Sequence, residues 1–192
     1  MLVGITGGIG SGKSTIATEL IRRGFPVYNT DSEAKRIIIH NPAVRSQIET
    51  LFGSEVFDGD IYRTAKVAEL VFANPDLLHK LNSIVHPAVK FNLQHWQKDK
   101  ELCFVESALL FESGLDALCN TIAIIDAPED IRIARTVARD HCTTEQVRAR
   151  IRSQHIQLPS ANDKQHITLI NDGAVPVSDL VDTLLQQLNT RT

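Results

Sequence analysis

A glycine-rich octapeptide near the start of the chain constrains this sequence more than any other feature. Residues 7–14 read Gly-Gly-Ile-Gly-Ser-Gly-Lys-Ser and satisfy every fixed position of the pattern G-x-x-x-x-G-K-[ST]. Residues 2–6 before it form a short apolar run, and residues 14–23 after it carry apolar side chains at helical spacing. A strand, a loop and a helix in this order are the context in which the pattern binds phosphate, so we predict a phosphate-binding loop here.

The chemistry of the loop predicts a polyphosphate ligand such as ATP. Glycines let the backbone turn its N–H groups inward as an anion-binding nest, and the N-terminus of the helix adds partial positive charge. We expect Lys13 to reach the β- and γ-phosphates and the Ser14 hydroxyl to ligate the Mg²⁺ that bridges them. A glycine-rich turn without a ligand is the alternative, which the spacing and the flanking elements both disfavour. The predicted nucleotide-binding residues of the loop are Gly8, Gly10, Ser11, Gly12, Lys13, Ser14 and Thr15.

The loop leaves the phosphoryl acceptor open, because water, a protein or a small metabolite can each receive the group. A GTPase carries an N-K-x-D sequence, which this chain lacks, and Asp126 is followed by Ala-Pro-Glu instead of the pattern D-x-x-G. A large mechanical ATPase normally needs more chain than 192 residues. These observations favour a compact kinase of a small molecule.

The composition is that of an ordinary globular protein, with 43% hydrophobic and 22% charged residues. The net charge of −3 gives no global electrostatic reason to expect nucleic acid or anionic lipid as a partner. The three cysteines are far apart and form no C-x-x-C pair, so neither a disulfide framework nor a zinc site is indicated. The first residues show no targeting signal, and we expect a cytoplasmic monomer or small homo-oligomer.

Strand-like and helix-like segments alternate in the first and last parts of the sequence. Helical spacing covers residues 31–39, begins again near Glu129 and near Thr144, and returns at residues 176–188. This alternation predicts an α/β fold with a parallel sheet covered by helices. The predicted strands are residues 2–6, 26–29, 102–105, 121–125 and 168–171.

A second pattern fills the middle of the chain. From about residue 42 to residue 100 the apolar residues keep helical spacing, with breaks at Gly53, Gly59, Pro75 and Pro87. This segment is predicted to be a helical insertion. Its periodicity alone describes a packing subdomain as well as it describes a substrate-binding one.

Several segments, in the same order along the chain, resemble the dephospho-coenzyme A kinase family. The loop resembles the family's T-G-G-I-G-S-G-K-S, and later segments resemble its D-A-D, H-P, L-L-F-E, lid and final-strand sequences. Three positions differ: Asn29 replaces the first aspartate of D-A-D, Ala108 replaces the proline before L-L-F-E, and Glu106 stands where many members have aspartate. The resembling segments are residues 5–15, 27–31, 85–87, 109–112, 138–140, 149–154 and 170–173.

The resemblance implies a parallel-sheet P-loop kinase domain over residues 1–192. Its core would comprise about residues 1–40, 101–140 and 166–192, with a helical acceptor-binding insertion at about 42–100 and a lid at about 141–165. The implied reaction moves the γ-phosphoryl group of ATP to the 3′-hydroxyl of the ribose of dephospho-CoA, with Mg²⁺ as cofactor. This is the last step of coenzyme A biosynthesis.

Three residues are predicted to act in catalysis: Lys13, Asp31 and Arg139. Asp31 follows the second predicted strand, at the edge where ligands collect in parallel sheets, and could accept the hydroxyl proton or hold the nucleophile in line. Its alternative role is to cap the following helix. Arg139 is the favoured stabiliser of the transferred charge, and Arg150 is a second nucleotide-binding candidate. For the remaining helical arginines a solvated helix face is the better prediction.

The resemblance also indicates a set of residues that would bind the acceptor. Glu106 ends the third predicted strand of the core, where it could orient Mg²⁺ or the acceptor, or serve as an ordinary strand-end carboxylate. His86 could contact the substrate or play a structural part. The predicted acceptor-binding residues are Asn29, Asp31, His86, Glu106, Leu109 and Glu112.

Two rival functions remain open at this point. One is a kinase of another small metabolite or nucleotide on the same core, which a screen of acceptors would separate. The other is a nucleotide-binding regulatory protein that transfers no phosphate; the combination of Asp31 with an intact Lys13 and Ser14 speaks against it.

Overall fold

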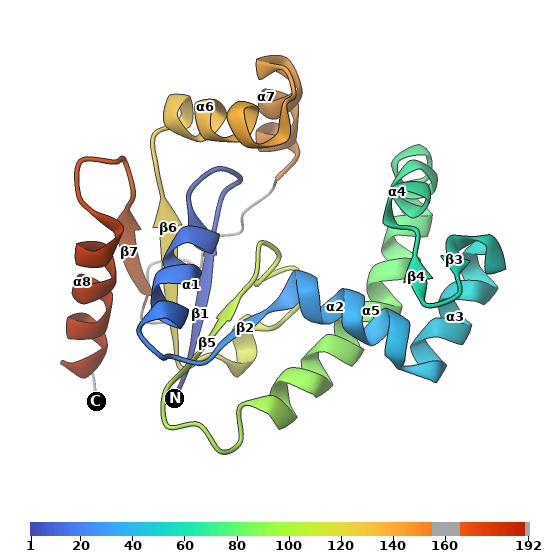
Figure 1. The fold of residues 1–192 in the computed structure, drawn as a ribbon, viewed down its shortest axis with the longest axis horizontal. Helices are drawn as coiled ribbons and strands as arrows, with labels where there is room; N and C mark the ends of the chain where they lie inside the picture. The colour runs from blue at the N-terminus through green and yellow to red at the C-terminus, as the bar shows by residue number, and fades with distance from the viewer. Residues whose placement is uncertain (155–165, 191–192) are drawn as a thin grey trace. The chain divides into compact units, whose positions relative to one another are not determined.

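The structure is a computed structural model that describes residues 1–154 and 166–190. Contacts between residues divide the chain into two compact units (Figure 1). One comprises Met1–Tyr28 and Lys100–Thr192, and the other comprises Asn29–Asp99. We call them the phosphate-loop unit and the helical unit and describe each by itself. The part of the predicted lid at residues 155–165 lies outside the described residues.

A five-stranded sheet forms the centre of the phosphate-loop unit, in the order β2-β5-β1-β6-β7. The pairings of β1 with β5, β1 with β6, and β6 with β7 are all parallel, as the sequence predicts. All six residues of β1 are buried, as expected for the central strand of a parallel sheet covered on both faces. The strands are β1 (Leu2–Gly7), β2 (Val27–Asn29), β5 (Cys103–Glu106), β6 (Thr121–Asp126) and β7 (His166–Ile170).

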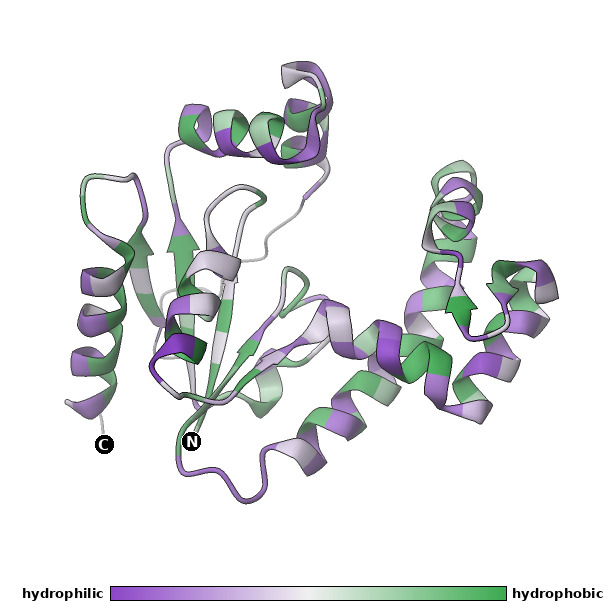
Figure 2. Ribbon diagram, in the orientation of Figure 1, coloured by the Kyte–Doolittle hydropathy of each residue, from purple (hydrophilic) through white to green (hydrophobic). Residues whose placement is uncertain are grey.

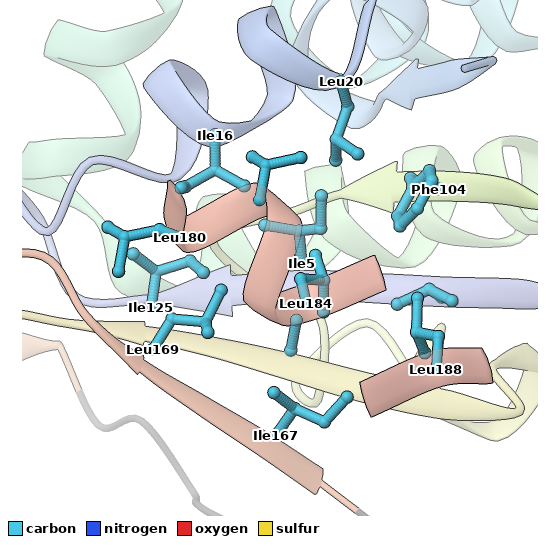
Figure 3. Close-up of a cluster of buried hydrophobic side chains, with 13 residues drawn as sticks. Ile5, Ile16, Leu20, Phe104, Ile125, Ile167, Leu169, Leu180, Leu184 and Leu188 are labelled. Atoms are coloured by element: carbon cyan, nitrogen blue, oxygen red, sulfur yellow. The ribbon is translucent and has the colours of Figure 1, made fainter. Parts of the chain in front are cut away.

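Helices α1 and α8 form a shared core with strands of the sheet (Figure 3). Helices α1 and α8 pack against each other, and their apolar faces place Ile16 and Leu184 in the same fully buried cluster as Ile5 of β1. The helical segments are α1 (Lys13–Arg22), η2 (Asp116–Leu118), α6 (Glu129–Asp140), α7 (Thr144–Ser153) and α8 (Val177–Asn189).

Strand register places several chain segments at one edge of the sheet. Ile5 of β1 pairs with Glu106 on one side, and Gly7 pairs with Ile125 on the other. The carboxyl ends of β1, β5 and β6 therefore lie side by side, where ligands bind in open parallel sheets. The phosphate loop begins at this edge.

The helical unit consists mainly of helices, as predicted, but it also contains a short antiparallel hairpin that the sequence reading missed. Phe57 pairs with Tyr62 and Asp58 with Ile61. Gly59 lies in the turn with a left-handed φ of 58°, which glycine adopts without steric cost. The elements are α2 (Thr30–His40), α3 (Pro42–Phe52), η1 (Ser54–Val56), β3 (Phe57–Asp58), β4 (Ile61–Tyr62), α4 (Thr64–Ala73) and α5 (Pro75–Trp96).

Pro87 does not interrupt the helical pattern as expected, because it lies inside the 22-residue helix α5. A proline in a helix interior costs about 3 kcal/mol, since it removes a hydrogen-bond donor and its ring clashes with the preceding turn. Val85, Val89 and Leu93 are buried along α5, which packs against α2, α3 and α4. Burial of this face offsets the local cost.

Hydrophilic residues recur along the helices of both units, whereas β6 is mostly hydrophobic (Figure 2). No helix within the described residues is long and apolar enough to cross a membrane.

Candidate active site

The phosphate loop connects the end of β1 at Gly7 to the start of α1 at Lys13. Gly10 and Gly12 have left-handed φ values of 76° and 96°. A Cβ atom at Gly10 would lie 2.3 Å from the carbonyl oxygen of Arg132, and one at Gly12 would lie 2.1 Å from Nδ2 of Asn171. Only glycine fits at these two positions, where the loop packs closely against α6 and against Asn171.

Lys13 folds back over the loop that precedes it. Its Nζ donates hydrogen bonds to the carbonyl oxygens of Gly7 at 2.8 Å and Gly8 at 3.1 Å. These bonds hold the ammonium group against the loop, beside the N-terminus of α1. An anion in the loop would therefore meet both the lysine charge and the positive end of the helix.

Ser14 and Glu106 form the second polar pair of the site. The Ser14 hydroxyl donates to Oε1 of Glu106 at 2.8 Å. Glu106 is the last residue of β5 and is only 7% exposed, so strand pairing with β1 brings this carboxylate to the base of α1. An ordinary acid at the end of a strand would be exposed to solvent. Glu106 is instead buried and hydrogen-bonded to a residue of the phosphate loop.

The other predicted loop residues occupy distinct environments. Gly8 is buried, and Thr15 is exposed on the first turn of α1. Ser11 is fully buried, and its carbonyl oxygen accepts a hydrogen bond of 2.9 Å from Nδ2 of Asn171. The Ser11 hydroxyl has no hydrogen-bond partner within the described part of the chain. The Ser11 amide donates to the Gly8 carbonyl oxygen at 3.1 Å, so both backbone polar groups of Ser11 help to fix the shape of the loop.

Helix α6 and the end of α7 contact the loop from outside, which the sequence reading did not foresee. Nε of Arg132 donates to the carbonyl oxygen of Ile9 at 2.9 Å, and Oε1 of Gln154 accepts from the Ile9 amide at 2.8 Å. Arg135 donates to the Asn171 carbonyl at 2.8 Å. The prediction of a solvated face was therefore wrong for Arg132 and Arg135. These contacts join residues more than thirty positions apart, and no local pattern reports them.

The two predicted nucleotide-binding arginines meet at one carboxylate. Arg139 donates from Nε and Nη2 to the two carboxylate oxygens of Asp140 at 2.7 and 3.1 Å, and Arg150 donates to Oδ2 at 3.0 Å. The hydrogen bond from Arg139 lowers the pKa of Asp140, and the bond to Asp140 raises the pKa of Arg139. Both arginine side chains remain largely exposed, so they could exchange this partner for a phosphate.

Leu109 and Glu112 lie in the loop that follows β5. Leu109 is 43% exposed and its amide donates to the Ser107 hydroxyl at 3.2 Å. Its carbonyl oxygen accepts from the Ser113 hydroxyl at 2.6 Å. Glu112 is exposed. Both side chains are therefore accessible to solvent from a loop that its own hydrogen bonds shape.

The remaining predicted residues belong to the helical unit. Asn29 is the N-cap of α2, and its Oδ1 accepts hydrogen bonds from the Ser32 amide and hydroxyl at 2.9 and 2.6 Å. The alternative prediction that Asp31 caps this helix was wrong, because Asp31 lies exposed within the first turn. His86 is half-buried on α5, and burial lowers its pKa.

Comparison with known proteins gives one consistent family. The family model described as dephospho-CoA kinase matches residues 1–176. A dephospho-CoA kinase of Porphyromonas gingivalis is 42% identical over 171 residues, which span 88% of this chain and 85% of that protein. One from Bacteroides fragilis is 36% identical over 194 residues, covering 97% and 94% of the two chains.

Solved structures agree with this result and extend the likeness of the fold. TT1252 from Thermus thermophilus superposes with a TM-score of 0.79 at 32% identity and covers all of this chain and 98% of its own. A dephospho-CoA kinase from Campylobacter jejuni has a TM-score of 0.67 at 24% identity, covering 97% and 96%. Shikimate kinase from Acinetobacter baumannii, at 16% identity and a TM-score of 0.60, shares the fold. The chain belongs to the dephospho-CoA kinase family.

Proposed function

We propose that this protein transfers the γ-phosphoryl group of ATP to the 3′-hydroxyl of the ribose of dephospho-CoA, giving CoA and ADP. The observation that carries the proposal is a complete phosphate loop with Lys13 folded over it and the Ser14–Glu106 pair at its base, in a member of this family. We also propose that the protein acts in the cytoplasm.

The residues at the base of the loop suit Mg²⁺. This cation prefers oxygen ligands and is usually held by one or two carboxylates together with substrate phosphates. Ser14 and Glu106 offer a hydroxyl and a carboxylate in direct contact, and they would hold the ion. When bound there, the ion would supply positive charge that offsets the negative charge of the phosphates.

Lys13 and the two arginines would stabilise charge on the transferred group. Lys13 would exchange the carbonyl oxygens of Gly7 and Gly8 for phosphate oxygens. Arg139 already makes a two-point contact with a carboxylate, and a phosphoryl group offers the same paired oxygens to a guanidinium. Donors positioned before the reaction stabilise the transition state without reorganising during it.

Asp31 is our candidate for the group that acts on the acceptor hydroxyl. It follows the carboxyl end of β2, and its carboxylate is exposed. Since Asn29 already caps α2, the helix does not need Asp31 for this purpose. The Asp31 carboxylate would accept the hydroxyl proton or orient the hydroxyl for in-line attack. The helical unit, with Asn29 and His86, would contribute to the choice of acceptor.

The first test is ADP release from MgATP by the purified protein, alone and with dephospho-CoA. A panel of nucleoside monophosphates and small alcohols gives the comparison. We expect ADP and CoA in equal amounts in the dephospho-CoA sample and only background ADP elsewhere. Turnover with another acceptor would contradict the substrate assignment, and nucleotide binding without acceptor-dependent turnover would contradict the kinase activity.

A further inference from the structure

Ile9 lies at the tip of the phosphate loop. Its backbone carbonyl and its backbone amide are both hydrogen-bonded to side chains from helix α6 and from the residue that ends α7. Its carbonyl oxygen accepts from Nε of Arg132 at 2.9 Å, and its amide donates to Oε1 of Gln154 at 2.8 Å. No other residue of the loop is held in this way by two side chains from these helices, as far as the described hydrogen bonds show. All three residues belong to the phosphate-loop unit.

Arg132 also lies in van der Waals contact with the loop. A Cβ atom at Gly8 would lie 2.1 Å from Nη2 and 2.5 Å from Cζ of Arg132. Glycine at position 8 therefore leaves the space that the guanidinium fills. The backbone of α6 is equally close, since a Cβ atom at Gly10 would meet the Arg132 carbonyl oxygen at 2.3 Å. The Arg132 side chain therefore binds the loop, and its backbone packs closely against Gly10.

Gln154 connects Ile9 to the helix that carries Arg150. Gln154 is the C-cap of α7. Its backbone N–H donates to the carbonyl oxygens of Arg150 and Ile151 at 3.1 and 3.3 Å. The Arg150 side chain in turn shares Asp140 with Arg139. Gln154 therefore links the loop tip to the last turn of α7, which carries Arg150.

We propose that Arg132 and Gln154 are positioning residues that clasp Ile9. The clasp fixes the loop tip relative to helices α6 and α7, and so relative to Arg139 and Arg150, which these helices carry. A loop that is ordered before the nucleotide arrives loses less conformational entropy on binding, so the clasp raises nucleotide affinity. The inference rests on the proposed function only in assigning the nucleotide to this loop.

The direct test is hydrogen exchange of the Ile9 amide, followed by NMR in the nucleotide-free protein. Gln154→Met keeps the length of the side chain but removes the acceptor, so we expect the Ile9 amide to exchange faster. Gln154→Glu keeps an acceptor oxygen and should retain the protection. Arg148→Ala is the matched control, because Arg148 is exposed on the same helix. Unchanged Ile9 exchange in Gln154→Met would overturn the clasp.

The second test is MgADP affinity by titration calorimetry, which requires no acceptor. We expect Gln154→Met and Arg132→Ala each to weaken binding by about 3- to 10-fold, the usual worth of one hydrogen bond. Because both side chains act on Ile9, the double variant should lose less than the product of the two effects. Arg148→Ala should bind as the unmodified protein does.

Two results would contradict the proposal at this step: wild-type affinity in both single variants, or effects that multiply fully in the double variant. Both measurements use nucleotide alone. If the protein failed to phosphorylate dephospho-CoA, the proposed acceptor would be wrong. The clasp would still be tested by the exchange and affinity measurements. Gln154 is partly exposed at a helix end, so its substitution spares the core even where Arg132→Ala perturbs folding.

Discussion

Asn29 and Asp31 lie only two positions apart at the start of α2: Asn29 has a structural role, and for Asp31 we propose a chemical one. Asn29 uses its side-chain oxygen to cap α2, and asparagine and aspartate serve this role about equally well. An aspartate at position 29 would therefore keep the cap. Asp31 does not cap the helix, and its carboxylate is exposed, which leaves it available for the chemical role that we propose.

The substitution Asp31→Asn tests this division of roles. The amide can neither accept the hydroxyl proton nor attract it by charge, so we expect kcat to fall by about 10²- to 10⁴-fold. Affinity for MgATP should stay unchanged, because the phosphate loop is untouched. Steady-state kinetics and nucleotide titration measure the two quantities.

Asn29→Asp is the matched control for Asp31→Asn. It changes the same kind of group two residues away and keeps the cap, so thermal stability and MgATP affinity should remain close to those of the unmodified protein, and kcat should fall far less than in Asp31→Asn. Near-normal turnover of Asp31→Asn would remove Asp31 from the catalytic role.

At the scale of elements, we expect His86 to make the stability of the unit that contains α5 depend on pH. Burial lowers the pKa of His86, so the unfolded chain takes up a proton at a higher pH than the folded one does. Stability rises with pH wherever the unfolded state binds more protons. The contribution of neutral His86 is therefore present above the unfolded pKa of about 6.5 and is lost as pH falls through the lower folded value.

We expect the free energy of unfolding to decrease between pH 7.5 and pH 5.5, and His86→Gln to make this decrease shallower. Urea denaturation at a series of pH values measures the slope. The control is His79→Gln, because His79 is exposed on the same helix and should leave the slope unchanged. An equal slope in both variants would show that the sensitivity arises elsewhere.

Elements with strong local signals could be predicted from the sequence, and elements decided by distant contacts could not. The apolar runs predicted every strand of the central sheet. The signal is strongest in β1, β5 and β6, which are buried on both faces over nearly their whole length. The hairpin at Phe57–Asp58 and Ile61–Tyr62 was missed although Asp58-Gly59 is a turn signal, because each strand has only two residues. The predicted break at Pro87 was wrong for a different reason, because the tertiary packing of α5 overrides the local preference of proline.

The candidate site divides in the same way. The spacing of residues 7–14 indicated the roles of Lys13 and Ser14, because a contiguous motif carries its own geometry. Arg132 and Gln154 contact Ile9 across 123 and 145 positions of chain. Neither side chain differs locally from others on its helix, so only the folded structure shows that they reach the loop.

At the scale of the whole molecule, the division into two units separates the proposed nucleotide contacts from much of the acceptor site. Lys13, Ser14 and Glu106 lie in the phosphate-loop unit, whereas Asp31 and His86 lie in the helical unit. A ligand stabilises whatever part of the chain must be folded to bind it. Nucleotide should therefore stabilise the phosphate-loop unit first.

Differential scanning calorimetry can measure this effect. At a free MgADP concentration of about 100 times Kd, binding adds about 2.7 kcal/mol to the free energy of unfolding. For a chain of this size that corresponds to roughly 5–11 °C in Tm. If the units unfold separately, only the transition of the phosphate-loop unit should move by this amount.

Lys13→Ala decides whether the shift comes from the phosphate loop. Without the ammonium group the loop loses the charge that faces the phosphates, so the increase in Tm should shrink at the same MgADP concentration, while Arg148→Ala should keep it in full.

Adding dephospho-CoA alone should instead raise the transition temperature of the helical unit, since that unit carries Asp31 and His86. An MgADP shift that survives Lys13→Ala intact would place the nucleotide elsewhere, and a helical unit indifferent to dephospho-CoA would remove it from acceptor binding.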